Sequence, residues 1–576
     1  MVGVIETLKA NITFKEFIFK YPLYLQTILS LSIGCSIFFL VADASIVNPK
    51  NTSWLMQGGG DPVFHFLGWK FFRLAPLLQW PFGANPAYGM GISSSVVFSD
   101  SIPLLAFIFK PFNPWLPDPF QYFGLWIFGC FLLQSFFACR LLANATEDKV
   151  LQITGSMFFV IAPFFLFRLV GHFALMGQWV ILAALCLYFK KEYSDSAWGA
   201  LLGITALIHF YLLVMVLMIW AADLYQRLMI KEMNYKQTVY AAAGCIGATL
   251  FIMWFAGYFM VEKSEHAFGF GYFRMNLLSP ISPDGWSGLL KYQLTGDGEY
   301  EGFNYLGIGI LVLSLFPGYL LIRKKIHLHK RQRPLYLLCL VLLALALSKK
   351  IAVGPYDLMS YHIPSWASKL TQMIRSSGRL FWPVSYLIYF AIFSIVFSRT
   401  KRRTAMALCL FLFVFQLIDS KHPLSGFKNR FTDCTASPSP LRSEEWRNIA
   451  QNYKKIFVVP PDSIVLRTSD KWWLLPDFAA DHDLPINSGL FGRYDIEKLN
   501  REKERLIRSI RDNNLDPDAL YFFEDANLWQ AANRHLSSSD LSATKDGFRF
   551  IAPNLKATSS IKMKKTGWSA RALQND

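Results

Sequence analysis

The chain has 576 residues, of which 53% are hydrophobic, 16% aromatic and only 17% charged. About a quarter of the residues in a typical soluble domain are charged, so the composition argues against a soluble protein. The formal net charge of +17 would favour nucleic-acid binding in a soluble protein, but here much of the positive charge lies in short connections between apolar runs. Because that pattern is typical of cytoplasmic loops, we expect a polytopic membrane protein with no nucleic-acid partner.

Apolar runs long enough to cross a bilayer recur through residues 1–418, since a transmembrane helix needs about 20 such residues. We predict about eleven transmembrane helices, near residues 23–42, 122–143, 150–167, 173–189, 197–209, 211–226, 238–259, 304–322, 334–348, 380–397 and 404–418. The first run is longer than the apolar region of about 7–15 residues in a signal peptide. We therefore expect it to remain as an uncleaved helix.

Basic residues between the predicted helices indicate the orientation of the chain. The apolar stretch 197–226 is long for one crossing at a rise of about 1.5 Å per residue. Two short helices with an outer turn at 209–211 instead place every strongly basic connection in the cytoplasm, as the positive-inside tendency requires; these connections lie at 190–191, 227–236, 323–333 and 399–403. The N-terminus is then cytoplasmic and the C-terminus lies outside.

Four long segments fall on the predicted outer side: the first loop at 43–121, then 260–303, 349–379 and the tail 419–576. In the tail, residues 456–459 and 519–523 are typical of buried strands, and residues 471–481 and 496–513 are typical of helices. Alternating strands and helices predict a small parallel α/β domain outside the cytoplasm. The transmembrane domain is therefore expected to cover residues 1–418.

The first candidate site lies in the first loop, in the sequence Gly58-Gly-Gly-Asp61-Pro62-Val-Phe-His65. Asp61 and Pro62 are a favourable N-cap and first-turn pair, and His65 falls one helical turn later on the same face. Two interpretations carry equal weight. Asp61 is either only a helix cap beside an interfacial histidine, or a general base at the membrane surface that takes a proton from an attacking hydroxyl.

Two further segments place arginines on the predicted outer side, and the two in the second segment run against the usual bias. Arg168 and His172 lie in a turn between helices, where they either extend to water or contact a phosphate. Arg375 and Arg379 precede an outer-to-inner helix. Arginine matches the geometry of phosphate oxygens, so these two residues predict either an anionic ligand or contact with lipid headgroups.

Acidic residues crowd the start of the predicted helix at 304–322. Glu299 and Glu301 either complement the helix dipole or hold a divalent cation or an acceptor sugar. His209, in the predicted turn at 209–211, is a further candidate for the acceptor or for a metal. The residues alone do not identify a metal.

The layout of an acidic residue in a long first outer loop, many membrane helices and an outer C-terminal domain resembles the GT-C superfamily of glycosyltransferases. More narrowly, five sequences resemble a group of bacterial membrane proteins with this layout: GGGDPVFHFLGW, FSDSIPLLA, RLVGHFALMGQW, GEYEGFNYLG and RSSGRLFWP. The resemblance implies transfer of a sugar from a polyprenyl-phosphate donor, with Asp61 as the catalytic carboxylate. Many members carry a second acid beside the first. Here Gly60 and Pro62 flank Asp61, and Asp100, the next acid in the loop, is the candidate to take the place of the second acid towards the acceptor or a metal.

The resemblance and the charges together predict an inverting glycosyltransferase in the bacterial cytoplasmic membrane that modifies an envelope glycan or lipid. His65 would assist Asp61, while the four cationic residues Arg168, His172, Arg375 and Arg379 would hold the donor phosphate. Membrane lipid is a further expected partner. The alternatives are a transporter or flippase for a lipid-linked envelope precursor, which needs polar residues inside its crossing helices, and a non-catalytic partner in envelope assembly.

Overall fold

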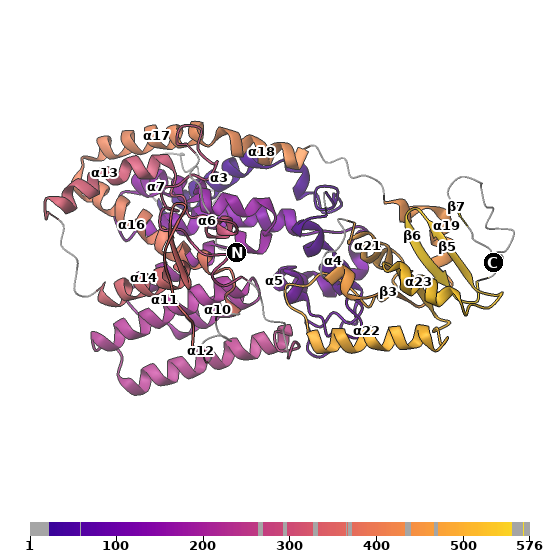
Figure 1. The fold of residues 1–576 in the computed structure, drawn as a ribbon. Coiled ribbons are helices and arrows are strands. Elements are labelled where there is room, and N and C mark those ends of the chain that lie inside the picture. The colour runs from indigo at the N-terminus through magenta and orange to yellow at the C-terminus, as the bar shows by residue number, and fades with distance from the viewer. Residues whose placement is uncertain are drawn as a thin grey trace, which may run out of the picture.

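The structure, a computed structural model, describes residues 22–57, 59–262, 269–291, 296–325, 332–364, 366, 371, 373–432, 439–465, 471–555 and 568–569. The predicted cytoplasmic N-terminus lies outside these residues. The described chain forms a helical bundle, an irregular loop region at one end of it, and a C-terminal domain with a small β-sheet (Figure 1).

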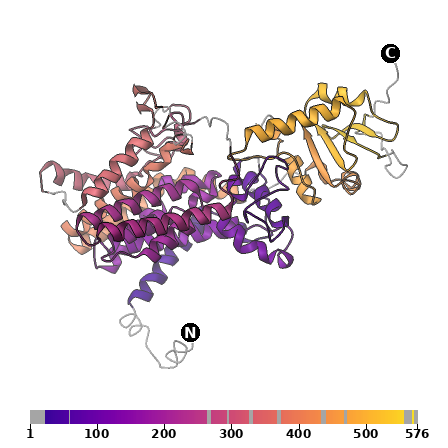
Figure 2. The same cartoon turned by 90° about the horizontal axis from the view of Figure 1, so that it is seen from below.

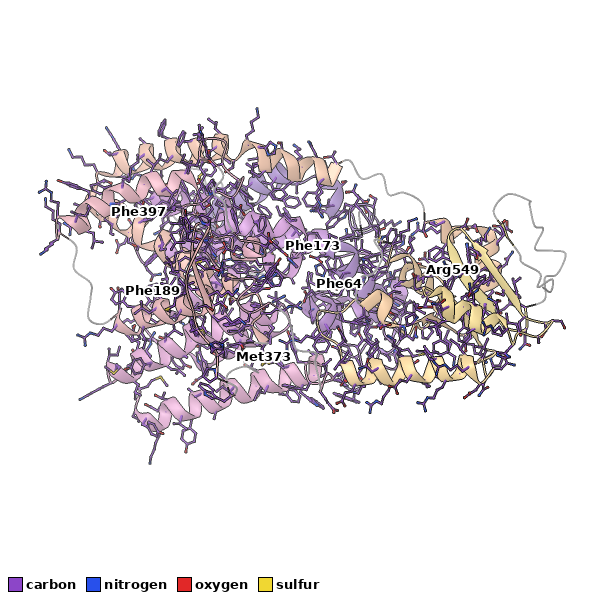
Figure 3. All side chains as sticks on the ribbon, viewed as in Figure 1. Phe64, Phe173, Phe189, Met373, Phe397 and Arg549 are labelled. Carbon is purple, nitrogen blue, oxygen red and sulfur yellow. The ribbon has the colours of Figure 1, made fainter. Side chains whose placement is uncertain are left out.

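The bundle consists of apolar helices with aromatic side chains packed between them. Its helices are α3 (Pro22–Val41), α6 (Phe123–Leu142), α7 (Lys149–Val160), α8 (Pro163–Leu166), α9 (Trp179–Phe189), α10 (Asp195–Ala206), α11 (Phe210–Met229), α12 (Tyr235–Ala256), α13 (Ile308–Ile322), α14 (Arg333–Leu347), α16 (Trp382–Arg399) and α17 (Arg402–Asp419). Phe189 and Phe397 lie within the bundle, whereas Phe64 and Phe173 lie where it meets the loop region (Figure 3).

Among the residues that the structure describes, five helices are long and apolar enough to cross a membrane, namely Tyr24–Val41, Phe123–Leu142, Phe210–Met229, Tyr235–Ala256 and Ser377–Arg399. The number rises to seven if two bent pairs each count as one span, Lys149–Val160 with Pro163–Val170 and Arg402–Asp419 with Lys421–Thr432. The remaining predicted positions hold shorter helices, three of which are apolar: Phe173–Phe189, Ile308–Ile322 and Arg333–Leu347. Helices thus lie at all eleven predicted positions, and five to seven of them are candidate spans of a membrane protein.

The long apolar stretch at 197–226 is broken, as its length predicts. α10 ends at Ala206 and α11 begins at Phe210, and the two helices pack against each other. His209 is the N-cap of α11, because its ring Nδ1 accepts the backbone N–H of Tyr211 at 3.1 Å. A side-chain acceptor at this position satisfies a free donor of the new helix, so the turn is set by the histidine itself.

The loop region comprises short helices between α3 and α6: η1 (Ala44–Val47), α4 (Asp61–Leu74), η2 (Val96–Ser99), α5 (Pro103–Phe109) and η3 (Lys110–Trp115). Further short elements come from later in the chain: η4 (Phe167–Val170), η5 (Phe173–Met176), η6 (Glu299–Gly302), η8 (Ser377–Phe381), the hairpin of β1 (Lys350–Val353) with β2 (Tyr356–Ser360), and α18 (Lys421–Thr432). Trp69 is fully buried, whereas Trp80 and Trp115 are exposed. The buried aromatic side chains of the loop therefore join the apolar core of the bundle, and a few large rings remain on the surface of the loop.

The C-terminal domain contains η9 (Pro440–Arg442), α19 (Glu444–Ala450), β3 (Lys455–Val459), α20 (Asp462–Val465), α21 (Leu474–Asp481), α22 (Ile496–Arg511), β4 (Ala519–Phe523), α23 (Ala526–Asn533), β5 (Leu541–Lys545), β6 (Phe548–Ala552) and β7 (Trp568–Ser569). Its sheet has the order β3-β4-β6-β5-β7. The prediction of a parallel sheet is correct for the pair β3–β4 and wrong for the others, which are antiparallel. Asp546 and Gly547, both at positive φ, join β5 to β6 in a two-residue hairpin turn that the prediction overlooked.

The C-terminal domain is attached to the loop region, at the end of the bundle away from the connection between α11 and α12 (Figures 1 and 2). Ile486 pairs with Tyr88 of the loop and with Ile456 of β3, so one extended segment links the two parts. Its carbonyl accepts the backbone N–H of Gly89 at 3.0 Å and of Met90 at 2.8 Å. Backbone pairing of this kind fixes the position of residues that follow it in the chain.

A second set of contacts holds α21 against the loop. Lys70 of α4 is largely buried and its Nζ lies 2.7 Å from Asp477 and 2.5 Å from Asp481. Trp472 donates its indole N–H to the carbonyl of Gly59 at 2.9 Å, two residues before Asp61. The C-terminal domain therefore contacts the candidate catalytic helix at both its start and its middle.

Candidate functional site

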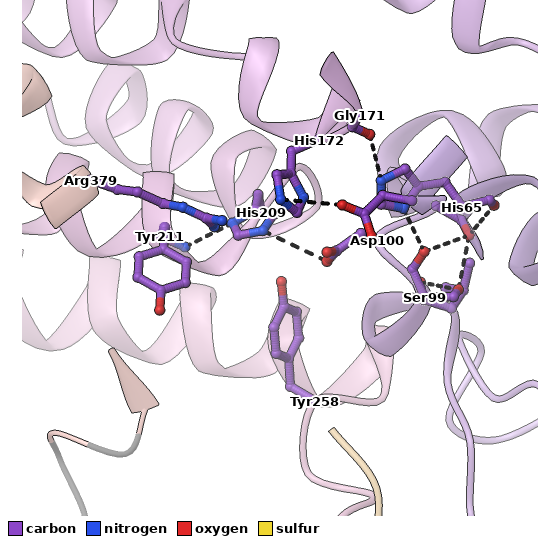
Figure 4. Close-up of polar contacts among 12 residues, drawn as sticks. His65, Ser99, Asp100, Gly171, His172, His209, Tyr211, Tyr258 and Arg379 are labelled. Atoms are coloured by element: carbon purple, nitrogen blue, oxygen red, sulfur yellow. Dashed lines mark hydrogen bonds and ion pairs between the residues drawn. The ribbon is translucent and has the colours of Figure 1, made fainter. Parts of the chain in front are cut away.

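A cavity of about 340 Å³ lies where the loop region, the bundle and the C-terminal domain meet. Its wall is formed by the residues around the end of η2, the turn before α11, the chain after α12, the chain before η8 and two residues of the C-terminal domain. The charged and polar side chains that line it are Asp100, His172, His209, Tyr211, Tyr258, Arg375, Ser376, Arg379 and Arg493. Figure 4 shows His172, His209, Asp100 and Tyr258 around one space.

Asp61 lies at the edge of this site, at the start of α4. Gly60 occupies the N-cap without a side-chain hydrogen bond, so the prediction that Asp61 caps the helix is wrong. Asp61 is instead the first helical residue, and its carboxylate Oδ2 lies 3.3 Å from His172 Nε2. About 29% of the Asp61 side chain is exposed, so this carboxylate is both held by a protein group and accessible to a ligand.

His172 connects Asp61 to a second carboxylate. Its Nε2 also lies 3.3 Å from Glu301 Oε1, so a proton on Nε2 is shared between the two acids. Glu301 accepts hydrogen bonds from Arg168 at 2.9 Å and from Arg379 at 2.7 and 2.8 Å. Despite the opposing effect of burial, the charges of Arg379 and Arg168 hold the pKa of Glu301 well below its usual range. Glu301 is therefore ionised and fixes His172 in place.

Arg168 supports the site from inside rather than facing the cavity. Its side chain is about 1% exposed and its guanidinium lies 4.9 Å from the ring of Phe167 and 5.2 Å from that of Trp382. Only one of its nitrogens bonds Glu301, while Nε and Nη2 have no protein partner among the described residues. In this arrangement Arg168 neutralises Glu301 and does not reach a ligand in the cavity.

Asp100 and His209 form a second acid–base pair on the cavity wall, with 3.6 Å between Oδ1 and Nε2. Since Nδ1 of His209 accepts a backbone N–H, the proton of the neutral ring lies on Nε2 and points to this acid. Burial lowers the pKa of His209 to about 4, so the ring is neutral at physiological pH.

The backbone around this acid is strained. Asp100 adopts φ +48° and Ile102 adopts φ +52°, a left-handed conformation that is unfavourable for both residues and most of all for isoleucine. Such strain is concentrated at functional sites.

His65 lies one turn after Asp61, as predicted, but it is fully buried. Its Nδ1 is 3.1 Å from the carbonyl of Ser99 and its Nε2 is 2.9 Å from that of Gly171. Burial lowers its pKa, with the charges of Asp100 and Asp61 opposing the shift. His65 therefore ties together the segments that carry Asp100 and His172, and a substrate cannot contact it without a rearrangement.

The remaining predicted residues are arginines that line the cavity and glutamates that bond to arginines. Arg375 is exposed and Arg379 is buried, and both line the cavity. Glu299 lies apart from Glu301 and bonds Arg274 Nε and Asn276 Nδ2, each at 2.9 Å. Because guanidinium groups occupy both glutamates, neither presents a free carboxylate to a cation. Within the described ranges, no group of three or more histidine, cysteine, aspartate or glutamate side chains could hold a metal ion.

Sequence reasoning missed four of the polar lining residues: Tyr211, Tyr258, Ser376 and Arg493. Tyr211 accepts the backbone N–H of Ser376 at 2.7 Å, and its ring lies 5.1 Å from the guanidinium of Arg379. The hydroxyl of Tyr258 donates to the carbonyl of Ala206 at 2.9 Å. Tyr211 lies within the predicted turn, which was a usable signal, whereas no local pattern distinguishes Arg493 from other arginines of the tail.

Comparison with known families matches two adjacent parts of the chain. Residues 31–421 match a domain of unknown function, DUF6311, and residues 445–553 match the DUF6311 C-terminal domain. No curated protein and no solved structure matches the chain. The first match includes Asp61, His172, Glu301 and Arg375, while the second includes Arg493.

Proposed function

We propose that this chain, which belongs to the DUF6311 family, is a membrane glycosyltransferase that moves a sugar from a polyprenyl-phosphate donor to an envelope glycan or lipid. In this proposal the eleven helices form a GT-C-like domain in the bacterial cytoplasmic membrane. The N-terminus is cytoplasmic, and the loop region and C-terminal domain lie on the outer face. The reaction inverts the configuration of the sugar at its anomeric carbon.

The observation that carries the proposal is the partly exposed Asp61 carboxylate, held 3.3 Å from His172, which lines the cavity together with Arg375. Glycosyl transfer from a lipid phosphate needs a base for the acceptor hydroxyl and a cation for the departing phosphate. Asp61 supplies the first group and Arg375 the second. The apolar lining residues Phe210, Met253, Phe259 and Val261 offer contact for the first part of a lipid chain.

The reaction follows from these positions. The acceptor hydroxyl gives its proton to Asp61 while its oxygen forms a bond to the anomeric carbon. The bond between that carbon and the phosphate oxygen breaks, and the polyprenyl phosphate leaves with the electron pair. Arg375 stabilises the negative charge that develops on the phosphate. The N–H of His172 keeps the Asp61 carboxylate oriented, and Glu301 keeps His172 oriented.

The proposal is tested by comparing envelope glycans of a deletion strain complemented with wild type, Asp61→Asn or Asp297→Asn. Loss of a general base lowers rates by about 10²- to 10⁴-fold, so the Asp61 variant should accumulate glycan lacking one sugar. Asp297 is exposed on the same side and serves as the matched control. Full modification by Asp61→Asn, at wild-type protein levels, would contradict the role of Asp61.

The same strains distinguish the transporter alternative. Polar side chains do occur inside the bundle, but they bond to one another: the hydroxyl of Tyr386 lies 2.7 Å from both Gln134 and Gln178. None of these three residues lines the cavity. Accumulation of a complete lipid-linked precursor on the cytoplasmic side, with no missing sugar, would replace the enzyme by a transporter.

A further inference from the structure

The C-terminal domain supplies part of the wall of the candidate cavity. Gly492 donates its backbone N–H to the carbonyl of Phe98 at 2.7 Å, next to the strained turn of Asp100. Arg493 Nη2 donates to the carbonyl of Met373 at 3.0 Å, and both Gly492 and Arg493 line the cavity. The domain therefore contributes an arginine to the same space as the residues of the bundle.

Arg493 and Arg375 differ from the other cavity arginine in their charge balance. Arg379 pairs with Glu301 through two hydrogen bonds. Among the described residues, neither Arg375 nor Arg493 forms an ion pair, and the pKa of Arg493 is lowered, first by burial and also by the charge of Arg375. Two like charges close together in a partly enclosed space are unfavourable unless an anion lies between them.

We propose that Arg375 and Arg493 form a two-arginine subsite for a lipid-linked phosphate, completed only when the C-terminal domain is docked. This inference rests on the proposed function and adds to it the residue that the second domain provides. Guanidinium groups bind phosphate oxygens through paired, charge-assisted hydrogen bonds, which suits two arginines better than one. The apolar residues Phe210 and Met253 on the same wall suit the adjoining lipid chain.

The contacts of the domain explain how Arg493 is held in position. The segment that carries it begins at Ile486, which pairs with the loop region, and passes Leu490, whose N–H donates to the hydroxyl of Tyr88 at 3.0 Å. Asn487 anchors the other side of this segment, because its side chain bonds both the N–H and the carbonyl of Val458 in β3. Arg493 is thus placed by bonds to both domains within seven residues of chain.

The test measures lipid binding and does not require sugar transfer. The purified full-length chain in detergent is titrated with undecaprenyl phosphate, with neutral undecaprenol and with inorganic phosphate, and bound species are quantified by native mass spectrometry. The variants are Arg493→Ala, Arg493→Lys and Arg375→Ala. Arg501→Ala is the matched control, since Arg501 lies exposed on α22 of the same domain. Thermal unfolding checks that each variant is folded.

Loss of one charge-assisted contact should weaken binding of undecaprenyl phosphate by about 10- to 100-fold in Arg493→Ala and in Arg375→Ala. Arg493→Lys should fall between wild type and Arg493→Ala, and undecaprenol binding and Arg501→Ala should match wild type within about twofold. A double variant that combines Arg375→Ala with Arg493→Ala should lose affinity by a factor that differs from the product of the two single losses, because both arginines hold one phosphate.

Three results would overturn the subsite. If Arg493→Ala binds undecaprenyl phosphate with wild-type affinity, Arg493 is not part of the subsite. Equal losses for undecaprenol and its phosphate would assign Arg493 a structural role alone. Arg493-dependent binding of inorganic phosphate without binding of the lipid would assign the site to a free phosphate. If Asp61→Asn leaves the glycan unchanged but lipid binding depends on Arg493, the phosphate subsite is supported and only the proposed sugar transfer is rejected.

Discussion

Two buried arginine clusters lie near opposite ends of α11 and differ in how fully their charges are matched. At the C-terminal end, Arg227 bonds Asp223 and Glu232, and its remaining N–H groups donate to the carbonyls of Lys190 and Lys191. At the N-terminal end, Glu301 is the one carboxylate among the described residues that pairs with the two arginines Arg168 and Arg379. The first cluster joins α11 to its neighbouring connections, whereas the second is under-matched and adjoins a cavity. Burial of charge alone therefore does not mark a functional site, but incomplete matching beside a cavity does.

The strongest test of this difference is Glu301→Gln, which leaves Arg168 and Arg379 without a carboxylate. Removing one partner of a buried ion cluster costs about 3–5 kcal/mol of unfolding free energy. We also expect the folded variant to lose activity, because His172 loses its second anchor. Denaturant unfolding in detergent measures the first effect and glycan analysis the second. Unchanged stability would show that the two arginines do not depend on Glu301.

A second test uses the pH dependence of stability that arises from His209, at the end of α11 beside the cavity. The pKa of His209 is about 4 in the folded chain and about 6.5 when unfolded, so protonation favours unfolding. Its stabilising contribution is present above pH 6.5 and is lost as the pH falls towards 4, by up to about 3 kcal/mol. The lowered pKa of His65 acts in the same direction. His209→Gln should flatten the stability curve between pH 7 and 5, and an equal slope would contradict the neutral ring.

The cluster around Arg227, whose charges are fully matched, predicts a smaller effect on stability and none on activity. Asp223→Asn should lower the unfolding free energy by about 1–3 kcal/mol, because Glu232 still pairs with Arg227 and the amide still accepts a hydrogen bond. Activity per folded molecule should stay at the wild-type level. If Asp223→Asn reduces activity as much as Glu301→Gln does, the contrast between the two clusters fails.

The smallest expected effect on stability comes from Gly171→Ala. A Cβ on Gly171 would lie 3.3 Å from the Cβ of Asp61 and 3.5 Å from Pro62, so α4 must shift by a few tenths of an ångström. We expect a loss of stability below about 1 kcal/mol and a loss of activity of up to about tenfold, since small displacements of catalytic groups slow reactions. Gly199→Ala is the control, because its Cβ would meet nothing within 4 Å.

Helix positions were predictable because apolar runs and basic connections are local features of the sequence. The break before α11 followed from the length of one apolar stretch, and the strands β3 and β4 followed from short β-branched and aromatic runs. The hairpin of β5 and β6 had a local signal, the Asp546-Gly547 turn, that the prediction did not use. Local patterns therefore account for most elements of the fold but only for part of the sheet.

The composition of the site was predictable only in part. The unexpected side of the membrane singled out Arg375 and Arg379, and a turn between helices singled out Arg168, but nothing local distinguished the buried Arg168 from the exposed Arg375. Glu299 and Glu301 are two residues apart and bond different arginines, which depends on how η6 is oriented in the fold. Arg493 reaches the cavity from the other domain. Long-range packing decides each of these outcomes, so one sequence cannot reveal them.

The docking of Gly492 and Arg493 against the loop region has a consequence for the biogenesis of the protein. A ribosome completes the helical bundle well before it reaches these residues, because chains grow from the N-terminus. A chain that is still being synthesised thus lacks both the cavity wall at Gly492 and Arg493 and the contact of Trp472 with Gly59 beside Asp61. The site closes only after the last domain has folded and docked, so a truncated or unfinished chain in the membrane would hold an incomplete site.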